Sequence, residues 1–422
     1  MIHHDTGSNR GMRDFNVFWV SESVADVFDR LVSLGIPLLA ISALSVSAIE
    51  LGVVSAMSTL PLLLITPIAG VIVDRSRIGR LLVSTNVSRA VLLAVLCLLG
   101  ITSTLSLTGL ASLALLIGAV AAIGNVATLA YTPVITPRPR LTLANTRISL
   151  TTAVADTLGL AAGGVLIGLL GSAGSIGLSA GAFAVAGLLL LLIRVREPRR
   201  DATPISPRLA SAQMWRGMRQ TVADRFVGPM AIASAWFNAF EQVLLINLLL
   251  VMSGQFHFDS GTIGFVLAAT GVGGLVGGFA AHVVRGRPIG TRLLLGKGFS
   301  MLGPLVTAVG LLFPDVALIL FAVGLSLFGF GTTIYNVHAV TLRQLLIDPG
   351  ILGRISASYR FIAHGSIPLG ALMAGVIGSL LGPSGAVMVA AASIALGSLA
   401  FAFTPPARLR CEPVAPTLKE HV

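Results

Sequence analysis

The chain has 422 residues, of which 55% are hydrophobic and only 11% are charged, and its net charge is +11. Soluble domains carry about 25% charged residues, so this chain has too few charges to give two or three soluble domains a wetted surface. The composition excludes an ordinary soluble protein and indicates a membrane protein, in which the 47 glycines would let helices approach closely.

Apolar stretches of roughly 20 residues, the length that crosses a bilayer, recur along the whole sequence. They predict twelve membrane helices, at about 17–40, 49–73, 81–100, 107–130, 148–170, 175–193, 229–252, 261–284, 293–312, 316–337, 357–380 and 385–403. The expected fold is an all-α membrane protein with twelve transmembrane helices in two pseudo-symmetric six-helix bundles.

The only long polar stretch separates the sixth and seventh of these segments. We therefore expect an N-terminal half at 1–193, a cytoplasmic linker at 194–225, a C-terminal half at 226–405 and a cytoplasmic tail at 406–422. The linker is rich in Arg, Pro and Ser, and a short surface helix is predicted within it from about Trp215 to Asp224.

The basic residues alternate with the apolar segments. If the N-terminus is cytoplasmic, 26 of the 28 Lys and Arg residues fall in cytoplasmic loops or helix ends, Arg292 and Lys297 among them. The other two, Arg30 and Arg89, lie inside predicted spans, and none lies in an outer loop. The positive-inside rule then predicts a multi-pass protein of the inner (cytoplasmic) membrane with both termini cytoplasmic. A nucleic-acid binder would not distribute its charge in this way, so no nucleic-acid partner is expected.

Each half contains a similar short motif at a similar place. Arg147-Ile148-Ser149 opens the segment 148–170, and Arg354-Ile355-Ser356 precedes the segment 357–380, with several glycines following in both. Chance similarity between low-complexity membrane segments is the alternative explanation. A parallel repeat of six-helix halves is the architecture of one large class of transporters, and the matching positions favour it.

The most specific short motif closes the segment 49–73 and reads Gly70-Val-Ile-Val-Asp74-Arg75-Ser-Arg-Ile-Gly79-Arg80. We expect Gly70 to allow close helix packing, and Asp74 to accept hydrogen bonds from a helix N-terminus and to pair with a nearby arginine. Arg75 and Arg80 would face lipid headgroups and hold the loop on the cytoplasmic side. The alternative is an ordinary basic loop. The ordered combination, Gly79 included, favours a conformational switch.

This motif resembles the signature of the major facilitator superfamily, and the resemblance covers about residues 13–405. The chain departs from the signature in three places: Arg77 and Ile78 lengthen the spacing to Gly79, Leu81 replaces the last basic residue, and the second half has His282 where an acid is expected.

Within the superfamily the chain looks most like a bacterial branch that includes enterobactin exporters and macrolide efflux proteins. The stretches RDFNVFWVSESVADVFDR, LTLANTRIS, YNVHAVTLRQ and LGRISASYRF carry this similarity. The resemblance implies export of a small organic molecule such as a drug, siderophore or secondary metabolite. Drug exporters often have Gly-Pro where this chain has Gly159-Leu160.

Three acids lie inside the first predicted span. Glu22, Asp26 and Asp29 fall on one stripe of a helix, because their spacing keeps them within roughly 60° of one another. Asp29 would lie roughly 18 Å along the helix, near the middle of the membrane. A charge at that depth costs at least about 2.5–3.5 kcal/mol, so Asp29 should face a wet cavity or a partner, either Arg30 or Arg89.

The seventh predicted span carries Asn238, Glu241 and Gln242, with Glu241 about as deep as Asp29. Two buried acids at matching depth indicate a cavity between the halves, which Asp156 could join. Structural alternatives stay open: Glu22 as an acid favoured by a helix N-terminus, Asp26 and Asp29 paired with Arg30, and Glu241 as a hydrogen-bonded structural acid.

These patterns predict a secondary active transporter that exports a small molecule by alternating access, coupled to proton antiport. Burial favours the protonated, neutral form of a carboxylate, and a neutral acid would no longer attract a cationic substrate. Protonation would therefore oppose retention of that substrate. The predicted substrate and proton site consists of Asp26, Asp29, Arg30, Asn238, Glu241 and Gln242, with Glu22, Arg89 and Asp156 as further candidates. The alternatives are proton-linked nutrient uptake in the same fold and a non-transporting membrane sensor or scaffold.

No enzyme, cofactor or metal site is predicted. The stretch from Gly290 to Lys297 has the wrong spacing for a phosphate loop, and no spaced group of Cys and His indicates zinc. The expected partners are the substrate, protons and membrane lipids, and the expected state is a monomer.

Overall fold

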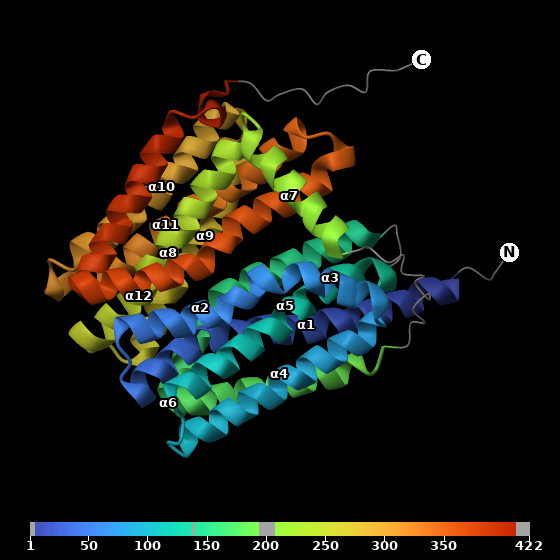
Figure 1. Cartoon of the computed structure of the whole chain (residues 1–422), viewed down its shortest axis with the longest axis horizontal. Helices are drawn as coiled ribbons and strands as arrows, with labels where there is room; N and C mark the ends of the chain where they lie inside the picture. The colour runs from blue at the N-terminus through green and yellow to red at the C-terminus, as the bar shows by residue number, and fades with distance from the viewer. Residues whose placement is uncertain (1–4, 137–139, 194–206, 411–422) are drawn as a thin grey trace. The chain divides into compact units, whose positions relative to one another are not determined.

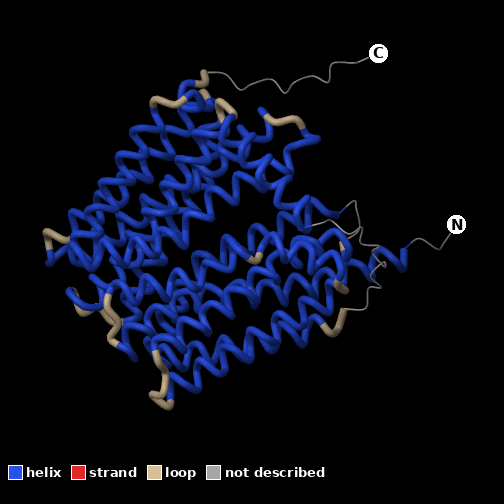
Figure 2. The backbone as a smooth tube through the Cα atoms, viewed as in Figure 1, coloured by secondary structure: helices blue, strands red, loops and turns tan. Residues whose placement is uncertain are grey.

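The computed structural model describes residues 5–136, 140–193 and 207–410. Within these ranges every regular element is helical, and no strand is present (Figure 2). The helices are α1 (Asp5–Leu44), α2 (Ala48–Leu64), α3 (Thr66–Arg75), α4 (Ile78–Ile101), α5 (Leu107–Ile135), α6 (Leu141–Leu190), α7 (Pro207–Ala223), α8 (Val227–Leu250), α9 (Ser260–Val283), α10 (Ile289–Gly310), α11 (Ala317–Leu346) and α12 (Pro349–Ala402). A π-helical turn, Val251–Gln255, continues α8. Helix α7 covers most of the surface helix expected near Trp215.

Nine helices of the described residues are long and apolar enough to cross a membrane, and α2 is a shorter apolar helix. The predicted segment 49–73 is divided into α2 and α3 at Ile65, because Pro67 opens α3 and cannot donate the hydrogen bond that would continue α2. A count of twelve spans stays a prediction.

Two of the long helices contain a break at a glycine. Gly171 in α6 has φ 72° and ψ 167°, and Gly382 in α12 has φ 72° and ψ 162°, so each of these helices consists of two helices joined at a kink. Only glycine adopts a positive φ without steric cost. The two breaks fall where the sequence predicted loops, between 170 and 175 and between 380 and 385.

The chain divides into two compact units. The N-unit comprises residues 1–204 with 259–265, and the C-unit comprises residues 205–258 with 266–422. In the N-unit α1 packs against α6, α2 against α5, and α4 against α5 and α6 (Figure 1). In the C-unit α8 packs against α12, α10 packs against α11 and α12, and α7 packs against α8 and α12.

The two units contain hydrophobic cores built from residues in the same register. The members at equivalent places differ by 211 or 212 residues: Phe15 and Val227, Phe18 and Met230, Ile78 and Ile289, Leu82 and Leu293, Ala127 and Ala339, Ile135 and Ile347, Ala144 and Ile355, Leu190 and Phe401. Gly171 and Gly382 share this spacing. An internal duplication explains such a constant offset.

This register corrects the repeat expected from the motifs. Arg147 and Arg354 are 207 residues apart, so the residue equivalent to Arg147 is Ser358. The glycines show the register directly: Gly159 lies against the backbone of Val27, and Gly370 lies against the backbone of Ala239. The motif comparison failed because it matched residue identity, whereas packing conserves position and size.

Helices α10 and α11 approach so closely that their backbones are in contact. A Cβ added at Gly303 would overlap the carbonyl oxygen of Gly324, and one added at Gly331 would overlap the backbone amide of Ser300. Small residues permit such approach, and in a membrane this packing drives helix association.

We predict that Gly331→Ala destabilises the protein by about 1–3 kcal/mol, because the methyl group must push the α10 backbone away. Gly298→Ala is the matched control on α10, since a Cβ there meets nothing within 4 Å. That control should be neutral or slightly stabilising. Thermal unfolding of the purified protein measures both, and equal midpoints would contradict the packing described for α10 and α11.

Candidate functional site

The acid stripe of α1 faces other helices of the N-unit. Thr128 of α5 donates a hydrogen bond from Oγ1 to the carboxylate of Glu22 at 2.8 Å. Thr152 of α6 donates from Oγ1 to Asp26 at 3.0 Å. The stripe predicted from sequence is therefore a place where α1, α5 and α6 meet through polar side chains.

Asp29 forms an ion pair with Nη2 of Arg89, which belongs to α4. The Arg89 side chain is only 10% exposed, whereas that of Asp29 is 43% exposed. Arg89 also lies over the ring of Phe183, with Cζ 3.9 Å from the ring centroid. Of the two partners open at the sequence level, Arg89 is the one that the structure places beside Asp29.

The remaining sequence candidates of the N-unit lie on the same helices. Helix α1 begins at Asp5, so Glu22 is far inside it and a helix N-terminus does not account for this acid. Arg30 follows Asp29 on α1, and its Cβ lies against Gly159 of α6. Asp156 is part of α6, but its side chain lies outside the described structure.

In the C-unit, α8 carries the equivalent positions. Asn238 is equivalent to Asp26, and its Nδ2 donates to the carbonyl oxygen of Ala363 at 2.7 Å, where Ala363 is equivalent to Thr152. Glu241 is equivalent to Asp29 and is half-buried, and within the described residues it has no hydrogen bond or ion pair. Gln242 is likewise half-buried on α8. The predicted acid of the C-unit therefore lacks the basic partner that Asp29 has.

A buried lysine, predicted to lie in a cytoplasmic loop or helix end, lies close to this region. Lys297 is inside α10 and only 5% exposed, so it is a buried residue and not part of a surface loop, and its membrane side stays a prediction. Its Nζ lies 4.2 Å from the ring centroid of Tyr335, 4.7 Å from that of Phe237 and 5.9 Å from that of Phe401. The predicted span 293–312 already contained Lys297, and depth within the helix was the signal that could have identified it. Arg292, counted with it, is also buried.

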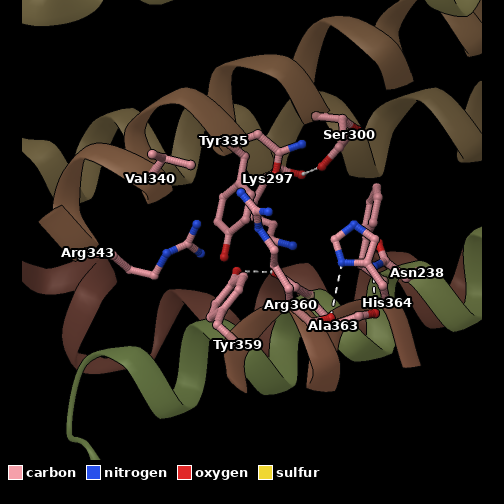
Figure 3. Close-up of a pocket in the computed structure, with 14 residues that line it drawn as sticks. Asn238, Lys297, Ser300, Tyr335, Val340, Arg343, Tyr359, Arg360, Ala363 and His364 are labelled. Carbon is pink, nitrogen blue, oxygen red and sulfur yellow. Dashed lines mark hydrogen bonds between the residues drawn. The ribbon is translucent and has the colours of Figure 1, made fainter. Parts of the chain in front are cut away.

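A cavity of about 250 Å³ lies next to Lys297 within the C-unit. Figure 3 shows basic side chains from three helices around it: Lys297 of α10, Arg343 of α11, and Arg360 and His364 of α12. No Asp or Glu is among the lining residues. The cavity is therefore a positively charged, partly aromatic site.

The cavity wall is held by hydrogen bonds between α8 and α12. The hydroxyls of Ser234 and Tyr359 are 2.7 Å apart, and Asn238 bonds to Ala363 as described. Arg343 lies over the ring of Tyr359, with Cζ 3.7 Å from the ring centroid. These contacts fix both the aromatic wall and the guanidinium group beside it.

The predicted switch motif lies at the junction of two helices. Gly70, Asp74 and Arg75 belong to α3, and Gly79 and Arg80 belong to the first turn of α4. The structure corrects the role expected for Gly70, because a Cβ added there meets nothing within 4 Å, so this glycine is not needed for close packing in this structure. Asp74, Arg75 and Arg80 are exposed. In the second half, His282 is exposed as well.

Across the part of the chain that the structure describes, no group of three or more His, Cys, Asp or Glu side chains could hold a metal ion. The site chemistry that remains is that of hydrogen-bonded acids and an ion pair in the N-unit, and of a cavity lined by basic groups in the C-unit.

The sequence from residue 11 to residue 416 matches the model of a protein family described as transmembrane secretion effector. No curated protein matches the sequence significantly.

Solved transporter structures share the fold. The nucleoside transporter NupG aligns with a TM-score of 0.73 and 11% identity, over 92% of this chain and 98% of that chain. A bacterial homologue of the iron transporter ferroportin, in an inward-facing state, aligns with a TM-score of 0.73 and 13% identity, over the same shares. A bacterial homologue of the human lysosomal transporter Spinster aligns with a TM-score of 0.68 and 14% identity, over 94% of each chain. At these identities the likeness shows the fold alone, which is that of membrane transporters.

We predict that the pair of Asp29 and Arg89 is energetically coupled. Removing one partner of a buried ion pair destabilises a protein by up to about 3–5 kcal/mol, because the other charge stays buried. Asp29→Asn should be worse than Arg89→Gln, since Arg89 is the more buried member. The double variant should lose less than the sum of the single losses.

Thermal unfolding of the purified variants measures this cycle. Arg80→Gln, which removes an exposed charge from the same helix as Arg89, should be close to wild type. Strictly additive losses for the two single variants would contradict the coupling.

Proposed function

Because the chain belongs to the transmembrane secretion effector family of major facilitator superfamily transporters, we propose that it is a secondary active transporter that exports a small organic molecule by alternating access. Family and fold are those of multi-pass membrane transporters and not of enzymes. The substrate that we propose is a drug, siderophore or secondary metabolite, and the driving force is proton antiport.

The proposed architecture is twelve spans in two six-helix halves, 1–193 and 226–405, with the linker 194–225 and the tail 406–422 on the cytoplasmic side of the inner membrane. The kinks at Gly171 and Gly382 support this count, because each divides one long helix at the same place of its unit. The distribution of basic residues supports the orientation. Each unit has its own hydrophobic core, and we propose that the protein is a monomer.

The observation that carries the proposal is the ion pair between Asp29 and Arg89 inside the apolar helices of the N-unit. Ionisable groups at membrane depth are rare and mark ion or substrate pathways in transporters. A proton on Asp29 would neutralise the carboxylate and break its ion pair with the buried Arg89 guanidinium, which would keep only the longer-range attraction of Glu22 and Asp26. The two protonation states therefore favour different surroundings for α1 and α4, which is what coupling to a conformational change requires.

Glu22 and Asp26 extend this role, because both are acids on the same stripe that are hydrogen-bonded to threonines of other helices. A change in the position of α5 or α6 relative to α1 would alter these bonds. The proton site that we propose is thus Asp29 with Arg89. Glu22 and Asp26 are neighbouring acids whose hydrogen bonds change when α5 or α6 moves relative to α1. Glu241 is the proposed counterpart in the C-unit.

Proton-linked uptake uses the same fold and the same acids, and the direction of substrate movement distinguishes it from export. A host strain that lacks the protein should become more sensitive to an exported toxic compound and should regain resistance on expression. If expression instead increases sensitivity, the protein takes compounds up and the export proposal is wrong.

For a compound identified in this way, we predict that Asp29→Asn and Glu241→Gln reduce pH-gradient-driven transport in inside-out vesicles. The transport rate should fall at least about tenfold, which corresponds to about 1.4 kcal/mol of activation free energy, because an amide cannot carry the proton. Asp315→Asn, which neutralises an exposed acid between α10 and α11, is the matched control and should transport normally.

Insertion of each variant is measured in parallel, because Asp29→Asn is also expected to be less stable. The double variant with Arg89→Gln separates the two effects, since it should recover stability and still fail to couple. Wild-type transport rates in well-inserted Asp29→Asn and Glu241→Gln would contradict the proton site, and so would an equal loss in the Asp315 control.

A further inference from the structure

We propose that the cavity of the C-unit binds the anionic group of an amphiphilic organic molecule, with Lys297, Arg343 and Arg360 supplying the positive charge. This names a substrate class for the transporter and rests on the proposed function in that respect. The binding site itself is defined by the cavity and its lining residues, all of which belong to one unit.

The charge of the lining is the first argument. The cavity carries Lys297, Arg343, Arg360 and His364 and no carboxylate. Within the described residues, Lys297 makes no side-chain hydrogen bond and no ion pair, although it is only 5% exposed. A buried charge without a partner is unfavourable, and in a membrane protein such a group usually faces its partner or a substrate pathway.

Aromatic rings compensate only part of this cost. The rings of Tyr335 and Phe237 lie near Nζ of Lys297, and the ring of Tyr359 lies beneath the Arg343 guanidinium. Cation–π contacts of this kind contribute about 0.5–2 kcal/mol each, whereas the effective penalty for burying an ion is several kcal/mol. An anionic group in the cavity would supply the missing interaction.

The two units differ in how their buried cations are compensated. In the N-unit the buried cation, Arg89, is neutralised by Asp29 of α1. In the C-unit the residue equivalent to Asp29 is Glu241, and no ion pair joins it to Lys297. Helices α4 and α10, which are equivalent in the duplicated fold, therefore each carry a buried cation, although at different positions, and among the described residues Lys297 has no counter-ion such as Asp29 provides for Arg89.

Polar and apolar groups of the same cavity fit an amphiphilic ligand. The hydroxyl of Thr332, which lines the cavity, is buried and has no hydrogen-bond partner among the described residues. Phe237, stacked on Phe328, and Val340 provide apolar wall. At about 250 Å³ the cavity is below the range of about 300–1,000 Å³ that is typical of drug-sized pockets. It suits a small organic acid or the anionic head of a larger molecule.

The test uses the purified full-length chain in nanodiscs of zwitterionic lipid and three probes of the same shape: benzoate, benzamide and benzylamine. We expect benzoate to bind, as measured by calorimetry and by an increase in Tm, and the neutral and cationic probes to bind at least about tenfold more weakly, as for loss of a charge-assisted hydrogen bond. Equal binding of benzylamine, or no binding of benzoate, would overturn the proposal.

Lys297→Gln and Arg360→Gln should each weaken benzoate binding by about tenfold or more. Arg360 is exposed at the cavity, so its variant is expected to fold even if the Lys297 variant does not. Lys297→Arg retains the charge and should bind more tightly than Lys297→Gln. The matched control is Arg285→Gln, which removes an exposed charge away from the cavity and should bind benzoate as wild type does. Wild-type affinity in Arg360→Gln and in a folded Lys297→Gln would overturn the proposal.

A second arm identifies the source of the anion. If phosphatidylglycerol in the nanodisc suppresses benzoate binding, a lipid headgroup occupies the site. If it does not, the ligand is a soluble organic acid, and both results support the anion site. Because these are binding measurements, benzoate binding without proton-coupled flux would retain this inference and reject the proposed function. Flux without benzoate binding would do the reverse.

Discussion

The need to neutralise charge inside an apolar environment constrains this molecule more than any other interaction. Arg89 is almost fully buried. The cost of burying its charge is lowered because the guanidinium donates a hydrogen bond to the Asp29 carboxylate and lies over the ring of Phe183. These contacts involve α1, α4 and the second part of α6, so the ion pair also defines how three helices of the N-unit fit together. Glu22 and Asp26 extend the polar contact to α5 and to the first part of α6. The same residues thus hold the helices together and offer the groups that protonation would change.

The duplicated architecture shows which features are required for folding and which are free to differ. The two cores keep the same offset of 211 or 212 residues, the same glycine contacts between the first helix and its partner, and the same kink at a positive-φ glycine. Their polar residues differ. The N-unit combines three acids with an arginine, whereas the C-unit has an asparagine, an unpaired acid and a lysine surrounded by rings. Packing constrains the size and shape of the core in both units, and the two units differ mainly in their charged and polar residues.

Much of the helical organisation could be predicted, because the length of each apolar segment and the polar or glycine-rich breaks between segments can be read from the local sequence. The stripe of Glu22, Asp26 and Asp29 was also predictable from helical spacing, and Arg89 was one of two named partners for Asp29. The register of the repeat, the free space around Gly70 and the burial of Lys297 were not predicted. The first two depend on which residues meet across helices, and such contacts leave no local pattern, whereas the position of Lys297 inside the predicted span 293–312 was a local signal of its burial. Lys297 in particular follows a group of basic residues in the sequence and so resembles a cytoplasmic lysine. The structure shows that it lies inside α10, surrounded by aromatic rings of α8, α11 and α12.

The opposite charge balance of the two units suggests how antiport would arise physically. In the N-unit Asp29 and Arg89 neutralise each other while Asp29 is deprotonated, and a proton on Asp29 breaks this ion pair. In the C-unit the buried cation is uncompensated in the free protein, and an anionic ligand supplies its partner. Proton binding therefore raises the free energy of one site, while ligand binding lowers that of the other. The state that holds the anion and no proton leaves neither cation without a partner, and the state that holds the proton and no anion leaves both. These two effects are additive, so coupling between proton and anion requires a conformational change that alters the surroundings of both sites together, and alternating access is such a change.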